Sequence, residues 1–408
     1  MSRIDELIQQ LCPDGVEYKM LGEIGTFVRG NGLQKKDFVD HGVGCIHYGQ
    51  IYTYYKTFAT ETKSFVTREL SLRLTQVYPN DLILACTSEN IEDVCKTVAW
   101  LGQETIVTGG HACVFRHKQN AKYLAYFFAT DYFFAQKKKF ARGAKVIDIK
   151  TEDLAKIVVP VPPLPVQEEI VRILDKFTAL EAELKAELKA RRKQYEFYRD
   201  QLLTFGDEVE WKPLGEVCDY VDYRGRTPPK TEKGIFLVTA KNIRRGFIDY
   251  STSKEYISEE DYATVMHRGK PEIGDVLITT EAPCGFVAQV DRTNIALAQR
   301  VIKYRSRTPK LSNCFLKFFL LGKCFQEKLD KAATGSTVKG IKGSKLHKLT
   351  IPVPPLAEQE RIVAILDKFD ALVNDISSGL PAELEMRRKQ YEYYRDRLLT
   401  FKPLAKEA

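Results

Sequence analysis

The sequence contains no uninterrupted apolar stretch close to the roughly 18 residues that a transmembrane helix needs. Its first residues, MSRIDELIQQLCPDG, lack the basic and then apolar pattern of a secretion signal. The nine cysteines are an odd number with no CxxC pair, which favours reduced thiols over a disulfide framework or a zinc site. These absences predict a cytoplasmic protein with no membrane segment.

Motifs for bond-making chemistry are also missing. The PP pairs occur as VPPL and TPPK, not in the [DN]PP[YFW] motif of amino-methyltransferases, and no GxGxxG, HExxH or GxSxG occurs. GSTVKGIKGSK approaches a phosphate-binding loop, but Lys342 and Lys345 stand in the wrong places. The six histidines have no metal-ligand spacing. We therefore predict a non-catalytic chain that holds neither metal nor cofactor.

The composition is that of a globular protein with a mild positive charge. The 408 residues allow two to four domains, and 44% hydrophobic with 11% aromatic residues exclude a disordered chain. Lysine and arginine number 62 against 54 acidic residues, a formal net charge of +8. This charge permits a polyanionic partner without requiring one.

One long stretch is present twice. Residues 159–205 read VPVPPLPVQEEIVRILDKFTALEAELKAELKARRKQYEFYRDQLLTF, and residues 351–401 read IPVPPLAEQERIVAILDKFDALVNDISSGLPAELEMRRKQYEYYRDRLLTF. The prolines at the start predict an extended approach, and the remainder of each copy predicts a long amphipathic helix. The chain is therefore a tandem duplication.

The first copy carries apolar residues at a seven-residue spacing, which indicates a coiled coil. A helix of about 40 residues would be roughly 60 Å long. In the second copy, Gly379 and Pro381 should interrupt the helix, with Pro381 at the start of a new segment. The predicted seam consists of Ile170, Leu174, Phe177, Leu184, Leu188, Tyr195, Tyr198, Leu202 and Phe205.

A variable region precedes each helix. VEYKMLGEI and EWKPLGEV open the two regions, and short β-branched runs broken by Gly, Asn and Asp follow. Aromatic helical stretches and glycine-containing basic loops close them. We predict two mixed α/β (α+β) heads with mainly antiparallel sheets. Short connections favour two antiparallel coiled-coil helices, a pseudo-two-fold dumbbell and a C-terminus near Val16. The predicted segments are a helical 1–15, heads at 16–158 and 208–350, helical regions at 159–207 and 351–401, and a tail at 402–408.

Several polar and basic side chains of the heads suit contacts with nucleic acid. Arginine and lysine hold phosphates or read guanine, and asparagine and glutamine pair with adenine. The matching basic loops at the ends of both heads carry the strongest signal. A solvated surface charge, or a half-buried strand tyrosine, is the competing explanation for each residue. The candidates are Tyr48, Gln50, Thr87, Ser88, Asn90, Arg142 and Lys145 in the first head, and Arg224, Arg226, Lys241, Asn242, Arg244, Lys339 and Lys342 in the second.

The duplicated blocks PVPPL, ILDKF and RRKQYE with YRD and LLTF resemble the specificity (S) subunit of type I restriction–modification systems. AELKAELK resembles the tandem repeat of the type IC branch. The resemblance implies two target recognition domains, each reading half of a split, asymmetric site in double-stranded DNA. It also implies two modification subunits that use S-adenosylmethionine and restriction subunits that use ATP and Mg. Of the base-contacting regions, only the loops at 143–150 and 335–342 carry over.

The two helices also offer more aromatic surface than one antiparallel pair needs, which predicts that modification subunits cover part of it. The candidate partner-binding residues are Tyr195, Phe197, Tyr198, Tyr391, Tyr393 and Tyr394. Two other functions stay open at this point. A single-chain methyltransferase or nuclease would act without partners, and a coiled-coil protein-interaction adaptor would bind no DNA in a sequence-dependent way.

Overall fold

A computed structural model describes residues 2–223, 228–335, 337–375 and 378–404. The chain divides into two compact units, and the first of them is drawn from two separate parts of the sequence. Unit 1 comprises Met1–Glu183 and Glu385–Ala408, and unit 2 comprises Leu184–Leu384. Among the residues that the structure describes, none of the helices has the length and apolar character needed to cross a membrane.

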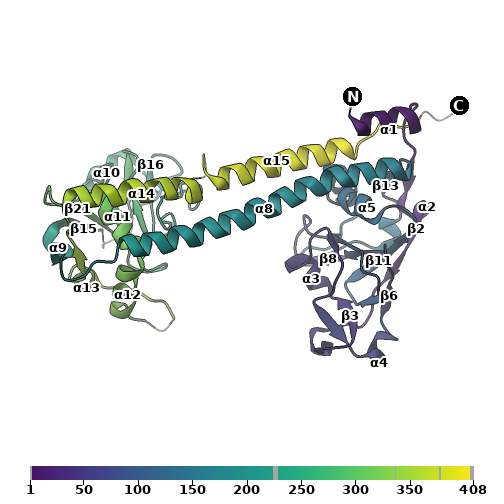
Figure 1. Ribbon diagram of the computed structural model, residues 1–408, viewed down its shortest axis with the longest axis horizontal. Helices are drawn as coiled ribbons and strands as arrows, with labels where there is room; N and C mark the ends of the chain where they lie inside the picture. The colour runs from purple at the N-terminus through teal and green to yellow at the C-terminus, as the bar shows by residue number, and fades with distance from the viewer. Residues whose placement is uncertain (1, 224–227, 336, 376–377, 405–408) are drawn as a thin grey trace. The chain divides into compact units, whose positions relative to one another are not determined.

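Unit 1 contains two packed sheets, with strand orders β2-β11-β7-β9-β4 and β5-β3-β10-β6 (Figure 1). Ile83, on the first sheet, packs with Ile46 and Ile106 of the second, whereas the neighbouring Leu84 faces helices α5 and α6. This alternation follows from the two-residue side-chain period of a strand. The strands are β2 Gly25–Arg29, β3 Val43–Ile46, β4 Phe58–Ala59, β5 Ser64–Val66, β6 Thr75–Val77, β7 Leu82–Ala85, β9 Thr97–Trp100, β10 Ile106–Thr108 and β11 Ala112–His117. Its helices include α3 Tyr48–Thr53, α4 Arg68–Ser71, α5 Ala121–Phe127 and α6 Asp131–Lys137.

Unit 2 repeats this topology in a smaller form, with strand orders β15-β21-β18-β19 and β17-β16-β20. In both units the second sheet contains one parallel pair, β3 with β10 and β16 with β20. Most of the pairs in the described regions are antiparallel, as predicted. The strands are β15 Cys218–Asp222, β16 Ile235–Val238, β17 Tyr256–Ile257, β18 Val276–Thr279, β19 Val287–Gln289, β20 Ile295–Leu297 and β21 Val301–Ser306. The helices over the sheet are α11 Asn313–Leu321 and α12 Lys323–Ala332, and α10 spans Glu259–Val265.

The first and last segments of each head pair with one another. Strand β1 (Tyr18–Met20) pairs with β13 (Val158–Pro160), and β14 (Trp211–Pro213) pairs in the same way with β22 (Thr350–Pro352). A one-turn helix follows each opening strand, and a second one-turn helix precedes each closing strand. These helices are α2 Leu21–Ile24, α7 Thr151–Leu154, α9 Leu214–Val217 and α13 Gly343–Leu346.

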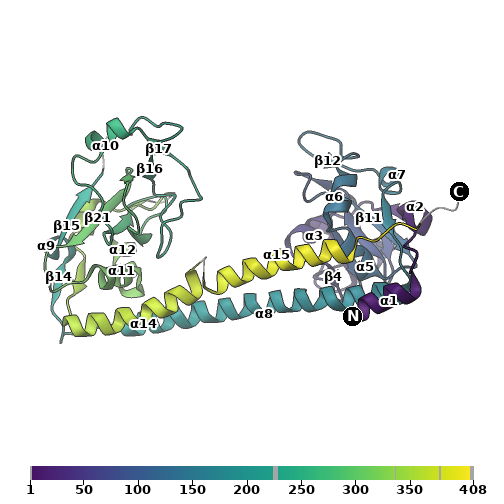
Figure 2. The same ribbon diagram turned by 90° about the horizontal axis from the view of Figure 1, so that it is seen from above.

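The C-terminal segment returns to the start of unit 1, as predicted. Val16 donates its backbone N–H to the Lys402 carbonyl at 2.8 Å and accepts from the Leu404 N–H at 2.9 Å. The predicted N-terminal helix is also present as α1, Arg3–Leu11, and its Ile4 is buried in the core of this unit. Helix α1 and the C-terminal segment lie at the same end of unit 1 (Figure 2).

Helix α8 is continuous over Leu164–Leu202, a length of 39 residues. It begins within the proline run, and Pro165 lies in its first turn, which tolerates proline because the first N–H groups have no helical partner. The prediction that the whole proline run is extended is therefore wrong at Pro165, and the extended part ends at Pro163. The predicted seam is recognisable, since Ile170 and Leu174 are fully buried and Tyr195 is 5% exposed.

The second copy forms two helices, α14 (Leu356–Asn374) and α15 (Leu380–Leu398), with Pro381 in the first turn of α15, as predicted. Within unit 2, α8 and α14 are antiparallel, because Arg192 contacts the Val373 carbonyl and Tyr198 stacks on Phe369. Within unit 1, Phe177 of α8 stacks on Tyr394 of α15 in the equivalent way, with ring centroids 5.4 Å apart.

Two fully buried glutamines fix the start of the long helices to the heads. Gln167 accepts the Asn120 N–H at 3.0 Å and donates to the Pro162 carbonyl. Gln359 makes the same pair of bonds in unit 2, to the Ser312 N–H and the Pro354 carbonyl. Because buried polar groups need hydrogen-bond partners, these contacts specify how each helix meets its head.

Candidate nucleic-acid interface

One edge of the main sheet gathers most of the candidate residues in unit 1. The end of β7, the start of β11 and the end of β2 meet there, since Ala85 pairs with Ala112 and Arg29 pairs with Cys113. Strand β8 (Thr87–Ser88) follows β7 at this edge. It pairs with β12 (Ile147–Asp148), the short strand that comes directly after the turn of the closing basic loop. The edge therefore joins segments that are far apart in the sequence.

The closing loops of the two heads are held by the same backbone hydrogen bonds. Arg142 and Asp148 exchange two backbone hydrogen bonds of 3.1 and 2.8 Å, and Thr334 and Gly340 exchange two of 2.8 and 2.9 Å. The glycine after the first member of each pair has a φ of +107° or +117°. Both loops are thus tight hairpin turns, held identically in domains whose sequences differ.

The basic residues of these loops are accessible. The Arg142 side chain is 66% exposed and lies 3.4 Å from Asp153, whose pKa is lowered chiefly by the hydrogen bond from Lys156. Lys145 and Lys342 are exposed, and Lys342 precedes the first residue of α13. Lys339 is exposed but binds Asp330 at 2.6 Å. Their contact with a nucleic acid stays a prediction that this accessibility permits.

The three candidate residues after β7 differ in how accessible their side chains are. Thr87 is 8% exposed and its carbonyl accepts the Tyr52 hydroxyl at 2.6 Å, so its side chain does not lie on the predicted surface. Ser88 is half-buried, and Asn90 is exposed in a turn where its amide group bonds Asp93. Of the three candidate residues in this segment, Ser88 and Asn90 are therefore the accessible ones.

Tyr48 and Gln50 belong to α3, not to the predicted strand. The ring of Tyr48 lies 5.0 Å from that of His111 and 4.5 Å from that of His47. Burial, followed by the charges of Lys35 and His111, lowers the pKa of His47. Gln50 accepts the His47 N–H at 3.0 Å, which begins the helix, and its amide donates to Ser64. The Gln50 side chain thus has a structural role in α3.

Asn242 occupies the place in unit 2 that Gln50 occupies in unit 1. It accepts the Thr239 N–H at 2.9 Å, donates to the Asp249 carbonyl and is fully buried. The prediction that Asn242 reads a base is therefore wrong for this structure, because its polar groups are used inside the loop. Arg244 is half-buried and pairs with Asp249 at 3.4 Å, whereas Lys241 is exposed. Arg224 and Arg226 lie outside the described residues.

The sequence analysis does not identify three residues that lie at this edge in unit 1 or at the equivalent edge in unit 2. Arg29, 48% exposed, donates to Asp148 at 3.1 Å. His111 and Arg300 occupy equivalent left-handed positions, with φ of 67° and 70°, and their carbonyls accept backbone N–H groups across the sheet at 2.8 Å. Their shared position before strands β11 and β21 is a signal that an alignment of the two heads would reveal. Within the described residues, no three His, Cys, Asp or Glu side chains come close enough to hold a metal ion.

The aromatic residues of the long helices divide into packed and exposed groups. Tyr195 is 5% exposed and Tyr391 is half-buried against Phe177, so these two belong to the helix packing and not to an open face. Phe197 is 63% exposed and Tyr393 is 58% exposed. Tyr198 and Tyr394, at 39% and 36%, stack on the neighbouring helix with one edge free.

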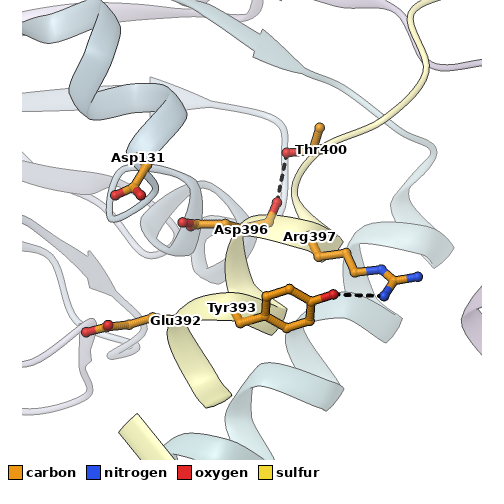
Figure 3. A pocket seen from close by; sticks show the side chains of 6 residues that line it. All are labelled: Asp131, Glu392, Tyr393, Asp396, Arg397 and Thr400. Atoms are coloured by element: carbon orange, nitrogen blue, oxygen red, sulfur yellow. Dashed lines mark hydrogen bonds between the residues drawn. The ribbon is translucent and has the colours of Figure 1, made fainter. Parts of the chain in front are cut away.

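Tyr393 lines a pocket of about 650 Å³ in unit 1, between α15 and the start of α6 (Figure 3). Its hydroxyl accepts a hydrogen bond from Arg397 at 3.1 Å. Asp396 and Glu392, also on α15, line the same pocket and point toward the side of Asp131 (Figure 3). Asp131, at the start of α6, closes the opposite side. The pocket is thus lined by one exposed ring and by charged and polar groups.

Comparison with known proteins agrees with this duplicated architecture. The family model described as "Type I restriction modification DNA specificity domain" matches residues 13–190 and again residues 206–386. The chain belongs to this family. Within the family, it is 42% identical over 271 residues to the specificity subunit of the Escherichia coli type I restriction enzyme EcoR124I/EcoR124II, covering 60% of this chain and 63% of that one.

Other relatives carry the same description. A putative type I restriction enzyme specificity subunit of Haemophilus influenzae is 32% identical over 278 residues, covering 64% of this chain and 68% of that one. The matches thus span about two thirds of the length of these relatives. A solved structure titled for complex assembly of the type I R-M system has a TM-score of 0.60, at 20% identity and 95% and 98% coverage of the two chains. A type I S subunit from M. genitalium has a TM-score of 0.50 at 12% identity, covering 94% and 96%, and both likenesses support the fold.

Proposed function

We propose that this chain is the DNA-reading subunit of a type I restriction–modification complex. Each unit reads one half of a split, asymmetric site in duplex DNA, and neither unit performs bond-making chemistry. The proposal rests mainly on one observation. Each of the two segments that match the DNA specificity family contains a hairpin loop that is closed by the same pair of backbone hydrogen bonds and that carries different, accessible side chains.

The edge of the main sheet is the proposed reading surface. Exposed cations supply the phosphate contacts that position a protein on DNA, and the variable polar groups beside them supply base contacts. Arg142, Lys145 and Ser88 fill these roles in unit 1, and Lys241, Lys339 and Lys342 fill them in unit 2. Because the side chains differ between the units, the two half-sites should differ in sequence.

The long helices are proposed to set the spacing of the half-sites and to bind modification subunits, two per complex. Helix α8 contributes to both units as one continuous element, which supports the first role. The exposed Phe197 and Tyr393 support the second. The modification subunits would carry S-adenosylmethionine and methylate adenine, and the restriction subunits would use ATP and Mg, all in the cytoplasm.

Adenine methylation across the genome tests this function. Cells that express the chain with its modification subunit are compared with cells that lack only this chain. We expect a split, asymmetric methylated motif that disappears without the chain. Unchanged methylation, with the modification subunit shown to be active, would favour a coiled-coil adaptor that binds only proteins, an alternative that the family membership disfavours.

A further inference from the structure

The turns of the two closing loops, residues 142–148 and 334–340, carry the same residue at only two equivalent positions. Residues 142–148 read RGAKVID and residues 334–340 read TGSTVKG, so the shared positions are Gly143 with Gly335 and Val146 with Val338. All other positions within the two turns differ. The identical residues that follow have structural reasons, because Ile149 and Ile341 are buried and Lys150 and Lys342 directly precede α7 and α13. A pair of positions that survives in otherwise divergent loops needs a physical reason.

The backbone explains the glycines. Both have a positive φ, and a Cβ atom at Gly143 would collide with the carbonyl oxygen of Val146, as one at Gly335 would with that of Val338. Only glycine avoids this clash at low cost. The glycine therefore fixes the turn in each loop and, with it, the position of the valine.

Packing within the chain does not explain the valines. Val146 is 58% exposed and Val338 is 56% exposed, and neither belongs to a hydrophobic cluster of its unit. An isolated exposed apolar residue is ordinary on a protein surface. That general tendency does not explain why the same β-branched residue stands at the same place in two divergent loops. A stiff side chain on a fixed turn suits a specific contact.

The surroundings of the valines indicate what they contact. Arg142 and Lys145 precede Val146, and Lys339 and Lys342 follow Val338, so each valine has accessible cations within four residues of it in the sequence. A polyanion with apolar groups fits this combination. In duplex DNA, the C5 methyl group of thymine is the apolar group that proteins contact in the major groove.

We propose that Val146 and Val338 are specificity-determining residues, each placing its methyl groups against the C5 methyl of one thymine in the half-site that its unit reads. This inference rests on the proposed function and refines it. Any half-site that contains a methylated adenine also contains a thymine opposite that adenine, so each unit has at least one such methyl within its target.

The test uses the full complex with its modification subunits and a duplex that carries the methylated motif. Each thymine is replaced in turn by uracil, which lacks only the C5 methyl. The variants are Val146→Ser and Val338→Ser, and Ile273→Ser is the control, because Ile273 is 64% exposed and precedes β18 at the end of that strand away from the closing loop. Binding is also measured on a scrambled duplex.

For the wild type, we expect one uracil in each half-site to weaken binding about three- to tenfold, the size of a buried methyl group's contribution. Val146→Ser should weaken binding to a similar extent and abolish the uracil effect in one half-site only. Val338→Ser should do so in the other, and Ile273→Ser should change neither. The two valine variants thus control for one another.

Three results would overturn the inference. The variants could retain wild-type affinity and uracil sensitivity, they could lose affinity equally for the scrambled duplex, or they could fail to assemble with the modification subunits, which would identify a protein contact. A wild-type complex that does not distinguish the motif from the scrambled duplex would instead contradict the proposed function itself.

Discussion

The two units share a scaffold and differ at its edge. The strand order β2-β11-β7-β9 of unit 1 recurs as β15-β21-β18-β19 in unit 2, and the buried Gln167 and Gln359 make equivalent bonds. At the edge of the sheet, by contrast, a histidine in unit 1 corresponds to Arg300 in unit 2. Buried contacts that hold the fold are duplicated, whereas the exposed side chains at this edge differ between the units.

A buried aspartate is present in both units but has different partners in each. This gives the largest predicted difference in stability between the units. Asp81 and Asp275 precede equivalent strands and accept a backbone N–H in the same way. Asp275 receives two bonds from Arg305, of 2.5 and 2.8 Å, and lies 3.3 Å from Lys303, whereas Asp81 lies 3.7 Å from Arg116. The ion pair is therefore complete only in unit 2.

Asp275→Asn should lower the free energy of unfolding of unit 2 by about 3–5 kcal/mol, because it leaves the buried Lys303 without its counter-charge and weakens the bonds from Arg305. Asp81→Asn should cost unit 1 less than about 1 kcal/mol, because the uncharged amide suits burial there. Urea unfolding followed by tryptophan fluorescence separates the units, since Trp100 reports on unit 1 and Trp211 on unit 2. Equal losses in the two units would contradict this difference.

The glutamine anchors should show the opposite pattern, an equal effect in both units. Gln167→Leu and Gln359→Leu each leave a buried backbone N–H and carbonyls without partners, which costs about 2 kcal/mol. Each variant should unfold its own unit at lower urea, as read from the tryptophan of that unit. A clear inequality between the two losses would show that the helices do not meet their heads in equivalent ways.

The same carboxylates predict different responses to acid. Burial is the largest influence on both, and it raises the pKa of Asp81 above 3.8. In Asp275 the bonds from Arg305, with the Glu272 N–H and the Lys303 charge, outweigh burial and lower the pKa below 3.8. Asp275 therefore stabilises unit 2 above about pH 3.8 and loses this contribution as the pH falls through its folded value.

The contribution of Asp81 to stability changes with pH in the opposite direction. Its charged form is disfavoured in the folded state, so acidification toward pH 3.8 relieves a penalty in unit 1. The difference in unfolding free energy between the wild type and Asp275→Asn should narrow as the pH falls below 3.8. For Asp81, the wild type should lose stability relative to Asp81→Asn as the pH rises above 3.8. Unfolding curves measured from pH 3 to pH 7 check both, and a shared pH profile would refute the assigned signs.

How far the sequence predicts this molecule depends on what each signal reports. The duplication predicts the long helices, the interruption near Gly379 and the equivalent closing loops, because these depend on local geometry and repeated spacing. The competing explanation of a strand tyrosine does not hold for Tyr48, because a short helix there begins at a hydrogen bond between Gln50 and His47. Asn242 is misassigned because a polar side chain that caps a loop has the same sequence signature as one that reads a base.

The exposed aromatic residues give the smallest predicted effect on stability and extend the comparison to the helices. Phe197 in unit 2 and Tyr393 in unit 1 occupy equivalent positions and are 63% and 58% exposed, so Phe197→Ala and Tyr393→Ala should change the free energy of unfolding by less than about 0.5 kcal/mol. If both bind modification subunits, each single variant should retain one modification subunit and the double variant none, as measured by the mass of the co-expressed complex.

Tyr393→Phe is the matched control for this pair, because it removes only the hydroxyl that Arg397 bonds and makes unit 1 resemble unit 2 at this position. Binding that survives in Tyr393→Phe but not in Tyr393→Ala would assign the contact to the ring, which the two units share. Binding lost in both variants would assign it to the hydroxyl, and the two docking positions would then differ. Full assembly of the double alanine variant would place the partner on another surface of the helices.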